Sequence, residues 1–451
     1  MAEPQNVVVI GSGAAGSGAA RALATAGWRV TMIERDRVGG TCLWRGCMPK
    51  KALYTSAKMM RFARDADRFG IDLGEPSADW QAVLAWKWHA QESYAGDQEG
   101  ILADRDIELV RGDARFASAD SIMVDGREIP MDACVLATGS VPREMGIPGE
   151  ELADTSETAL RYPELPKHLV IIGGGYIGME FAGIFASLGS KVTVVMRDAE
   201  PLPALDPDAV AVARRRLEHV GVRFIPNARV TALAGEPGDI AVEITGIESG
   251  ESATLGADHV LSAIGRVPAS RDLDLDAGGI EVDERGRIVA DSYLRTTNPK
   301  VWVAGDVAGG MMQTPVASYE GRTVAASIQG NLTQPECHLV PTTVFTIPQL
   351  AQVGLTEAQA TAQGIEYKVA HQSFEYLGAA IIENKQDGMV KLLFSADDDR
   401  LLGVHIAGPT ASDLTYGLAV AMRAGATSAM VRDTMGVHPA YNELVNWAAW
   451  I

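Results

Sequence analysis

The feature that most restricts the fold of this chain is an internal repeat. The stretch from Ile10 to Asp36 matches the stretch from Ile172 to Asp198 without a gap. Each copy has a short apolar run, a cluster of glycines, a longer apolar run and a second strand-like segment, which is the pattern of strand, turn, helix and strand. A unit of this kind used twice predicts an α/β protein with two related halves.

Each copy carries GxGxxG between its first strand and its helix. The six glycines are Gly11, Gly13, Gly16, Gly173, Gly175 and Gly178. Glycine lets the backbone approach a pyrophosphate, whose charge the helix N-terminus stabilises. Neither copy ends in GK[ST], which excludes a P-loop. The sequence therefore predicts two dinucleotide sites.

The two copies differ at the end of the second strand. Glu34 stands there in the first copy and can accept hydrogen bonds from an adenosine ribose. The second copy has Met196 followed by Arg197, which removes a negative charge and offers a partner for a 2′-phosphate. We therefore expect NADPH rather than NADH at the second site. Arg35 follows Glu34 in the same way, so Arg197 could also be an incidental solvated residue.

Two cysteines five residues apart, Cys42 and Cys47, lie where a glycine-rich turn meets a helix-like run. Such a pair can form a reversible disulfide, and Pro49 suits the first turn of the helix. The helix N-terminus would favour a thiolate at Cys47. A zinc site is the alternative, but the spacing is poor for zinc and no second ligand pair completes it. We expect no metal.

With its flanks, this stretch resembles the redox-active segment of the class I flavoprotein disulfide oxidoreductases. The family includes glutathione reductase, to which the likeness is greatest, dihydrolipoamide dehydrogenase and mercuric reductase. The matching residues are Gly39, Gly40, Thr41, Cys42, Gly46, Cys47, Pro49 and Lys50. Trp44 and Arg45 depart from the small or amide residues typical of the family, which affects the expected substrate but not the disulfide chemistry.

The resemblance extends over essentially the whole chain and implies FAD as the first cofactor. Two buried strands that end in tight turns, at 132–143 and 300–310, are similar to segments that close the FAD site. The positions implied to border FAD outside the glycine turn are Thr41, Thr138, Gly139, Asp306 and Thr314. The alternative for Asp306 is a simple polar strand end.

The resemblance also implies a homodimer with a shared active site. His438 and Glu443 match the HPxxxE signature, in which the histidine faces the disulfide of the partner subunit and the glutamate orients the imidazole. An imidazole suits proton transfer to and from thiols near neutral pH. Lys50 and Glu180 match a pair beside the flavin, and Tyr176 matches an aromatic gate over the nicotinamide pocket.

The length of the chain agrees with a protein of several domains. The chain of 451 residues predicts about three domains. We expect two Rossmann-like dinucleotide-binding domains and a C-terminal α+β interface domain. The predicted bounds are 1–145 and 267–335 for the FAD domain, 146–266 for the NAD(P)H domain and 336–451 for the interface domain.

A net charge of −19 argues against nucleic acid and anionic membranes as partners. No apolar run approaches a membrane span, and the N-terminal residues lack the pattern of a signal peptide. With only four cysteines, a cytoplasmic protein with a catalytic disulfide is expected.

The expected function is NADPH-dependent reduction of a low-molecular-weight, glutathione-like disulfide to two thiols. The alternatives are a dihydrolipoamide dehydrogenase, or a transhydrogenase or quinone reductase in which the cysteines are a switch. Arg21, Arg322 and Arg45 are candidates for binding an anionic substrate, and solvated helix arginines are the alternative for each.

Overall fold

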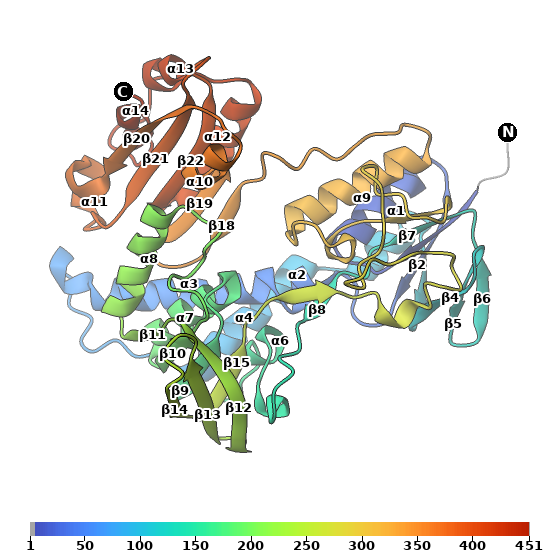
Figure 1. Ribbon diagram of the computed structural model, residues 1–451, viewed down its shortest axis with the longest axis horizontal. Helices are drawn as coiled ribbons and strands as arrows, with labels where there is room; N and C mark the ends of the chain where they lie inside the picture. The colour runs from blue at the N-terminus through green and yellow to red at the C-terminus, as the bar shows by residue number, and fades with distance from the viewer. Residues whose placement is uncertain (1–4, 451) are drawn as a thin grey trace. The chain divides into compact units, whose positions relative to one another are not determined.

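The computed structural model describes residues 5–450, which form two compact units (Figure 1). The first unit contains the chain up to Ala52, Leu84–Arg143 and Gly265–Cys337. The second contains Leu53–Val83, Glu144–Ile264 and the chain from His338 onward. The four domain bounds given above stay predictions.

The first unit is built around a parallel five-stranded sheet in the order β17-β7-β1-β2-β3. Its strands are β1 (Asn6–Ile10), β2 (Arg29–Glu34), β3 (Glu108–Arg111), β7 (Ala133–Leu136) and β17 (Val301–Val303). The central strands β1 and β7 are almost wholly apolar and buried, as both faces of a parallel sheet are covered.

Two helices of the first unit, α1 (Ala14–Thr25) and α9 (Thr314–Ile328), pack closely together (Figure 1). A Cβ added at Gly321 would come within 2.1 Å of the Ala15 carbonyl oxygen, so glycine allows this approach. The remaining helices that begin in this unit are α2 (Gly40–Trp44), α3 (Cys47–Arg64) and α5 (Gln98–Ala103). α3 continues into the second unit, and α4 (Trp80–Ala95) has residues in both.

Smaller antiparallel elements complete the first unit. One sheet contains β4 (Ala114–Ser118), β5 (Ser121–Val124) and β6 (Arg127–Pro130), and β8 (Ser140–Pro142) pairs with β16 (Arg266–Pro268). Phe116 and Ile122 of the three-stranded sheet share a core with Val8 and Ile10 of β1.

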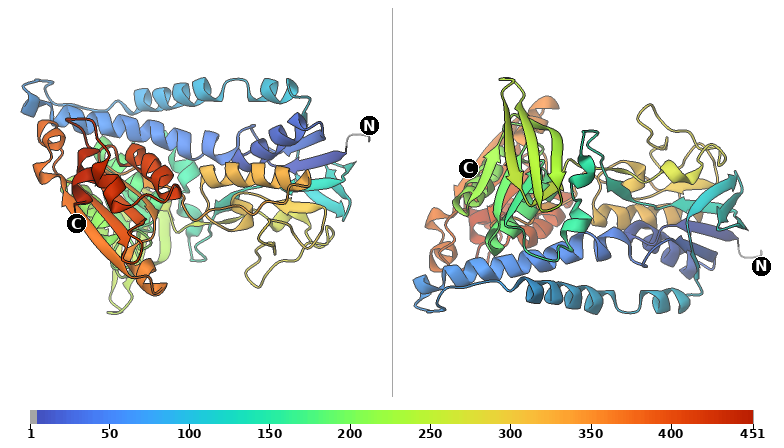
Figure 2. Two further views of the ribbon diagram at one scale, coloured as in Figure 1. Left: turned by 90° about the horizontal axis from the view of Figure 1, so that it is seen from above. Right: turned by 90° about the horizontal axis from the view of Figure 1, so that it is seen from below.

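The second copy of the repeat lies in the second unit. Its parallel sheet has the order β11-β10-β9-β15, with β9 (His168–Ile172), β10 (Lys191–Val195), β11 (Val222–Ile225) and β15 (His259–Ser262). Helix α7 (Tyr176–Leu188) follows the glycine turn. Helix α6 (Ser156–Ala159) contacts β15, and α8 (Pro207–His219) contacts β11. A meander of β12 (Ala228–Glu236), β13 (Asp239–Gly246) and β14 (Ser252–Ala257) packs beside it (Figure 2).

The C-terminal part of the second unit is an antiparallel sheet in the order β18-β19-β22-β21-β20. Its strands are β18 (Thr342–Val344), β19 (Gln349–Gly354), β20 (Tyr367–Ser373), β21 (Met389–Ser395) and β22 (Leu401–Gly408). Its helices are α10 (Glu357–Ala362), α11 (Gly378–Ile382), α12 (Ala411–Arg423), α13 (Ser428–Asp433) and α14 (Glu443–Ala448). This architecture, with two dinucleotide-binding folds and an α+β end, confirms the predicted fold class.

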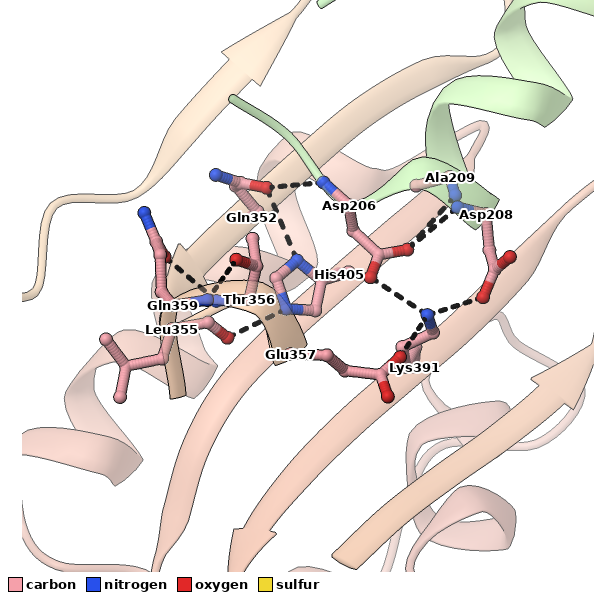
Figure 3. A network of polar contacts seen from close by, with 10 residues as sticks. All are labelled: Asp206, Asp208, Ala209, Gln352, Leu355, Thr356, Glu357, Gln359, Lys391 and His405. Carbon is pink, nitrogen blue, oxygen red and sulfur yellow. Dashed lines mark hydrogen bonds and ion pairs between the residues drawn. The ribbon is translucent and has the colours of Figure 1, made fainter. Parts of the chain in front are cut away.

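The two faces of this C-terminal sheet are different. Val390, Leu392 and Phe394 of β21 belong to the apolar core that α12 and α14 cover. The alternate residue, Lys391, points to the other face, where it contacts carboxylates (Figure 3). No helix in the described part of the chain is long and apolar enough to span a membrane.

Candidate active site

The first glycine turn leaves no room for side chains. Gly11 has φ +101°, and an added Cβ would lie 2.4 Å from the Ala137 carbonyl oxygen. A Cβ at Gly16 would meet the Gly11 carbonyl oxygen at 1.8 Å. Gly13 caps α1 without any side-chain hydrogen bond, so the N–H groups of the first turn are open to an anion.

Glu34 reaches back from the end of β2 to this turn. Its Oε2 accepts hydrogen bonds from Ser12 N at 2.9 Å and Ser12 Oγ at 2.6 Å. Ser12 Oγ in turn accepts from Gly39 N at 3.0 Å. Glu34 thus lies at the glycine turn, as a ribose ligand requires. Sequence reasoning missed Ser12, for which the only signal is its place between two motif glycines.

Four other residues expected to border FAD lie in this unit at the ends of strands or at helix starts. Thr138 Oγ1 donates to the Ala269 carbonyl oxygen at 2.6 Å, and Gly139 has φ +75°. Asp306 Oδ2 accepts from Ser140 Oγ at 2.6 Å. Thr314 is the first residue of α9. The open helix start and tight glycine cradle fit a dinucleotide such as FAD.

A further residue of α9 was not assigned a role from the sequence. Glu320 is buried and accepts a hydrogen bond from Gly305 N at 2.7 Å, just before Asp306. Burial raises the pKa of Glu320. This contact fixes the turn that carries Asp306, and no local pattern identifies a partner fifteen residues away.

The two cysteines lie on consecutive helices. Cys42 is in α2 and is half-buried, whereas Cys47 is exposed and begins α3; both are free thiols. Thr41 precedes Cys42 in α2, and Pro49 lies in the first turn of α3 as predicted. Cys47 Sγ is 3.3 Å from Thr314 Oγ1, so the pair meets the start of α9.

The electrostatics of the two thiols are unequal. A hydrogen bond with Cys47, followed by burial, raises the pKa of Cys42, and a hydrogen bond with Thr314 acts in the opposite direction. The Cys42 thiol therefore keeps its proton to a higher pH than an ordinary cysteine does, because its pKa is raised. Deprotonation of Cys42 requires a base.

The two residues that depart from the family pattern have local structural partners. Trp44 is buried, its Nε1 donates to the Val38 carbonyl oxygen at 2.8 Å, and the Arg37 guanidinium lies 3.4 Å from the ring centroid. Arg45 Nη1 is 2.6 Å from Asp36 Oδ2. The Asp36 carboxylate neutralises the charge of Arg45. Of the three arginines considered for binding an anionic substrate, Arg45 is therefore the weakest candidate.

The other two arginines lie on the packed helices α1 and α9. Arg21 is half-buried, and its Nε has no hydrogen-bond partner among the described residues. Arg322 is exposed, and its Nη1 donates to Ser318 Oγ at 2.8 Å. Neither is paired with an acidic side chain within the described residues.

The second glycine turn repeats the geometry of the first. Gly173 has φ +114°, and a Cβ at Gly178 would meet the Gly173 carbonyl oxygen at 2.0 Å. Gly175 caps α7 without a side-chain hydrogen bond. Met196 is buried against Gly174, and Arg197 is exposed. The place of the ribose-binding carboxylate is thus taken by a thioether next to a cation.

Helix α7 carries two further candidates. Tyr176, its first residue, is partly exposed. Glu180 is buried and accepts from Phe345 N at 2.9 Å. Lys50 lies one turn after Cys47 on α3.

His438 and Glu443 form the predicted pair. His438 Nδ1 lies 2.7 Å from Glu443 Oε1, and Glu443 Oε2 accepts from Ala440 N at 2.9 Å. The hydrogen bond from His438 lowers the pKa of Glu443. The His438 side chain is 79% exposed, so its Nε2 is available to a group outside this chain.

Among residues 5–450, no cluster of three or more His, Cys, Asp or Glu side chains could hold a metal ion. The site is thus a dithiol next to an open dinucleotide turn, with a second such turn in the other unit.

The chain belongs to the pyridine nucleotide-disulphide oxidoreductases. Residues 5–321 match this family, and residues 340–449 match its dimerisation domain. The chain is therefore an enzyme that uses FAD and a pyridine nucleotide, and its C-terminal domain is of the kind that forms homodimers.

Named relatives cover nearly the whole chain. It is 34% identical over 449 residues to dihydrolipoyl dehydrogenase of Geobacillus stearothermophilus, covering 98% of this chain and 95% of the relative. It is 33% identical over 439 residues to glutathione reductase of Burkholderia cepacia, covering 97% of both. The solved HOCl-induced flavoprotein disulfide reductase RclA from Escherichia coli matches at a TM-score of 0.88 and 31% identity, covering 98% of both chains.

Proposed function

We propose that the enzyme uses NADPH to reduce a low-molecular-weight, glutathione-like disulfide to two thiols through Cys42 and Cys47. The observation that carries this proposal is that Cys42 and Cys47 are free thiols hydrogen-bonded to each other, with Cys47 Sγ 3.3 Å from Thr314 Oγ1 at the start of α9. Bound FAD would accept hydride from the coenzyme and reduce the cysteine disulfide.

The proposed cycle assigns different tasks to the two cysteines. Cys42, once deprotonated, attacks one sulfur of the substrate and forms a mixed disulfide, which releases the first thiol. Cys47 then attacks the Cys42 sulfur, restores the internal disulfide and releases the second thiol. The two electrons consumed are those of one NADPH.

Proton transfer falls to His438 of the partner subunit. Its Nε2 takes the proton from Cys42 and returns it to the leaving thiol, while Glu443 fixes the tautomer through Nδ1. The short Nδ1 contact with Glu443 and the exposure of the imidazole support this role. Lys50 and Glu180 are proposed to lie beside the flavin, with Tyr176 over the nicotinamide pocket.

The preference for NADPH depends on Met196 and Arg197. The strand end lacks a carboxylate that would repel a 2′-phosphate, and Arg197 is exposed beside it. Arg197→Ala should raise the KM for NADPH about ten-fold or more and leave that for NADH nearly unchanged. Wild-type enzyme that uses NADH as well as NADPH would contradict the assignment.

A dihydrolipoyl dehydrogenase is the second candidate, favoured by named relatives at 33–36% identity. A panel of oxidised glutathione, a neutral disulfide such as lipoamide, and quinones would separate the candidates. Because RclA was also solved as a Cu(II) complex, Cu(II) belongs in the same panel. Quinone turnover that survives alkylation of the reduced enzyme would favour the quinone reductase instead.

Arg21 and Arg322 are proposed to bind substrate carboxylates. If they do, Arg322→Glu should raise the KM for an anionic disulfide far more than that for lipoamide, and added salt should weaken the anionic substrate alone. A better neutral substrate without salt dependence would favour the dihydrolipoyl dehydrogenase.

A further inference from the structure

A cavity of about 360 Å³ lies in the second unit. It is lined by the second half of α3, the end of α8, the residues between β18 and β19 and the loop after α11. Its volume is in the range of small-molecule sites, which is roughly 300–1,000 Å³. None of its residues belongs to the proposed disulfide or coenzyme chemistry.

The walls of this cavity are strongly positive. Its lining includes five lysine and arginine residues but only two aspartates, although the chain as a whole has a net charge of −19. Two cations are already paired: Arg216 with Asp387 at 3.2 Å, and Lys385 with Asp65 at 3.8 Å. Three cations remain, and within residues 5–450 none of them is ion-paired: Lys58, Arg61 and Arg68.

Arg61 is the most unusual of the three. Arg61 is only 8% exposed, and its Nη1 donates a hydrogen bond to the Ile347 carbonyl oxygen at 2.9 Å. Burial, followed by repulsion from Arg216, lowers the pKa of Arg61 to about 10. Asp65 attracts this guanidinium, but within residues 5–450 no carboxylate lies at ion-pair distance from it, whereas buried charges are normally paired.

The remaining walls are apolar. Phe62 and Met59 of α3 are large side chains that stay about half exposed, and Ile347 and Pro348 also line the cavity. A ligand that fills this volume therefore meets both apolar side chains and cations.

We propose that this cavity binds a small organic anion with a flat apolar body, its phosphate or carboxylate held by Arg61, Lys58 and Arg68. The planar guanidinium of Arg61 suits such oxygens, because it presents several N–H donors in one plane. The apolar body lies against Phe62 and Pro348. The site lies along the second half of α3, the helix that begins at Cys47.

The test uses the FAD-loaded dimer and 1-naphthyl phosphate as the probe, with binding measured by calorimetry. Wild-type enzyme should bind the probe, and neutral 1-naphthol or inorganic phosphate alone should bind at least ten-fold more weakly. Lys58→Met combined with Arg68→Met should weaken probe binding about ten-fold or more. Both residues are exposed and unpaired, so this double variant tests the site even if Arg61→Met fails to fold.

Two matched variants identify the site. Arg229→Met removes an exposed arginine of β12 outside the cavity and should not alter binding. Arg197→Ala and saturating NADPH should also leave binding unchanged, because the coenzyme site is separate. Absence of binding to wild type, equal weakening by Arg229→Met, or loss on addition of NADPH would each overturn the proposal.

Discussion

The imbalance between the two cysteines can be tested at the level of single residues. Because Cys47 raises the pKa of Cys42, Cys47→Ala should shift the alkylation of Cys42 to lower pH. The change is measured as the pH of half-maximal iodoacetamide labelling of reduced holoenzyme, read by mass spectrometry. Buried Cys134 serves as the internal control.

Both Cys42→Ser and Cys47→Ala should abolish disulfide reduction. A labelling profile of Cys42 that stays in place, or moves to higher pH, would contradict the assignment of Cys47 as the first thiol to ionise.

The exposed imidazole allows a second test at this scale. His438→Ala should slow the thiol exchange half-reaction by about 100-fold or more, while reduction of the holoenzyme by NADPH stays nearly intact. Rapid mixing separates the two halves of the reaction. Glu443→Gln should give a smaller loss in the same half, since it keeps the imidazole. Equal slowing of both halves would make His438 a structural residue.

At the scale of elements, a buried lysine of the C-terminal sheet contacts the start of α8 (Figure 3). Lys391 is 2% exposed and contacts Asp206 at 2.9 Å, Glu357 at 2.8 Å and also Asp208. Asp206 is itself buried and also caps α8 through Asp208 N and Ala209 N. The Asp206 carboxylate therefore caps the N-terminus of α8 and also joins this helix to β21 through its ion pair with Lys391.

Lys391→Met should lower the free energy of unfolding by about 3–5 kcal/mol, because it leaves Asp206 charged, buried and without its cation. Lys368→Met on the neighbouring strand is the matched control, since that lysine is 52% exposed and lies 3.5 Å from Asp399. The control should cost about 0–1 kcal/mol. Denaturant unfolding of both variants gives the comparison, and equal losses would contradict it.

The same lysine predicts a dependence on alkaline pH. Burial alone would lower the pKa of Lys391, but its hydrogen bonds to Asp208, Glu357 and Asp206 raise it overall. Its contribution to stability is thus complete below the unfolded pKa of about 10.4 and is lost as the pH rises through the higher folded value. As the pH is raised from neutral, the gap in unfolding free energy between wild type and Lys391→Met should therefore begin to narrow only in that alkaline range.

Sequence patterns predicted contacts between residues that are close in the chain, but they did not predict polar pairs between residues that are far apart in it. The glycine turns and the His438–Glu443 contact follow from residues close in sequence, and both were foreseen. The pairing of Lys391 with Asp206, and that of Glu320 with Gly305, depends on how separate elements pack, which no spacing along the chain encodes. Trp44 and Arg45 were noticed as departures, but their partners Val38 and Asp36 became visible only in the structure.

At the scale of the whole molecule, the proposed sharing of the active site between two subunits predicts complementation between inactive subunits. Neither Cys42→Ser nor His438→Ala homodimers should reduce disulfides. A mixed dimer of the two has one complete site, so unfolding and refolding them together in equal amounts should restore about a quarter of wild-type activity by random association. Differently tagged subunits allow the mixed dimer to be purified, and an inactive mixed dimer would place His438 and the cysteines of one site in the same chain.

The raised pKa of Cys42 also has a consequence for chemical damage. Peroxides and other oxidants attack thiolates far faster than thiols, so a cysteine that keeps its proton is spared the irreversible steps of sulfur oxidation. If the base that removes this proton comes from the second subunit, a newly made or dissociated subunit carries a shielded Cys42. Assembly would then switch on the reactivity of Cys42 only where a complete site is ready to use it.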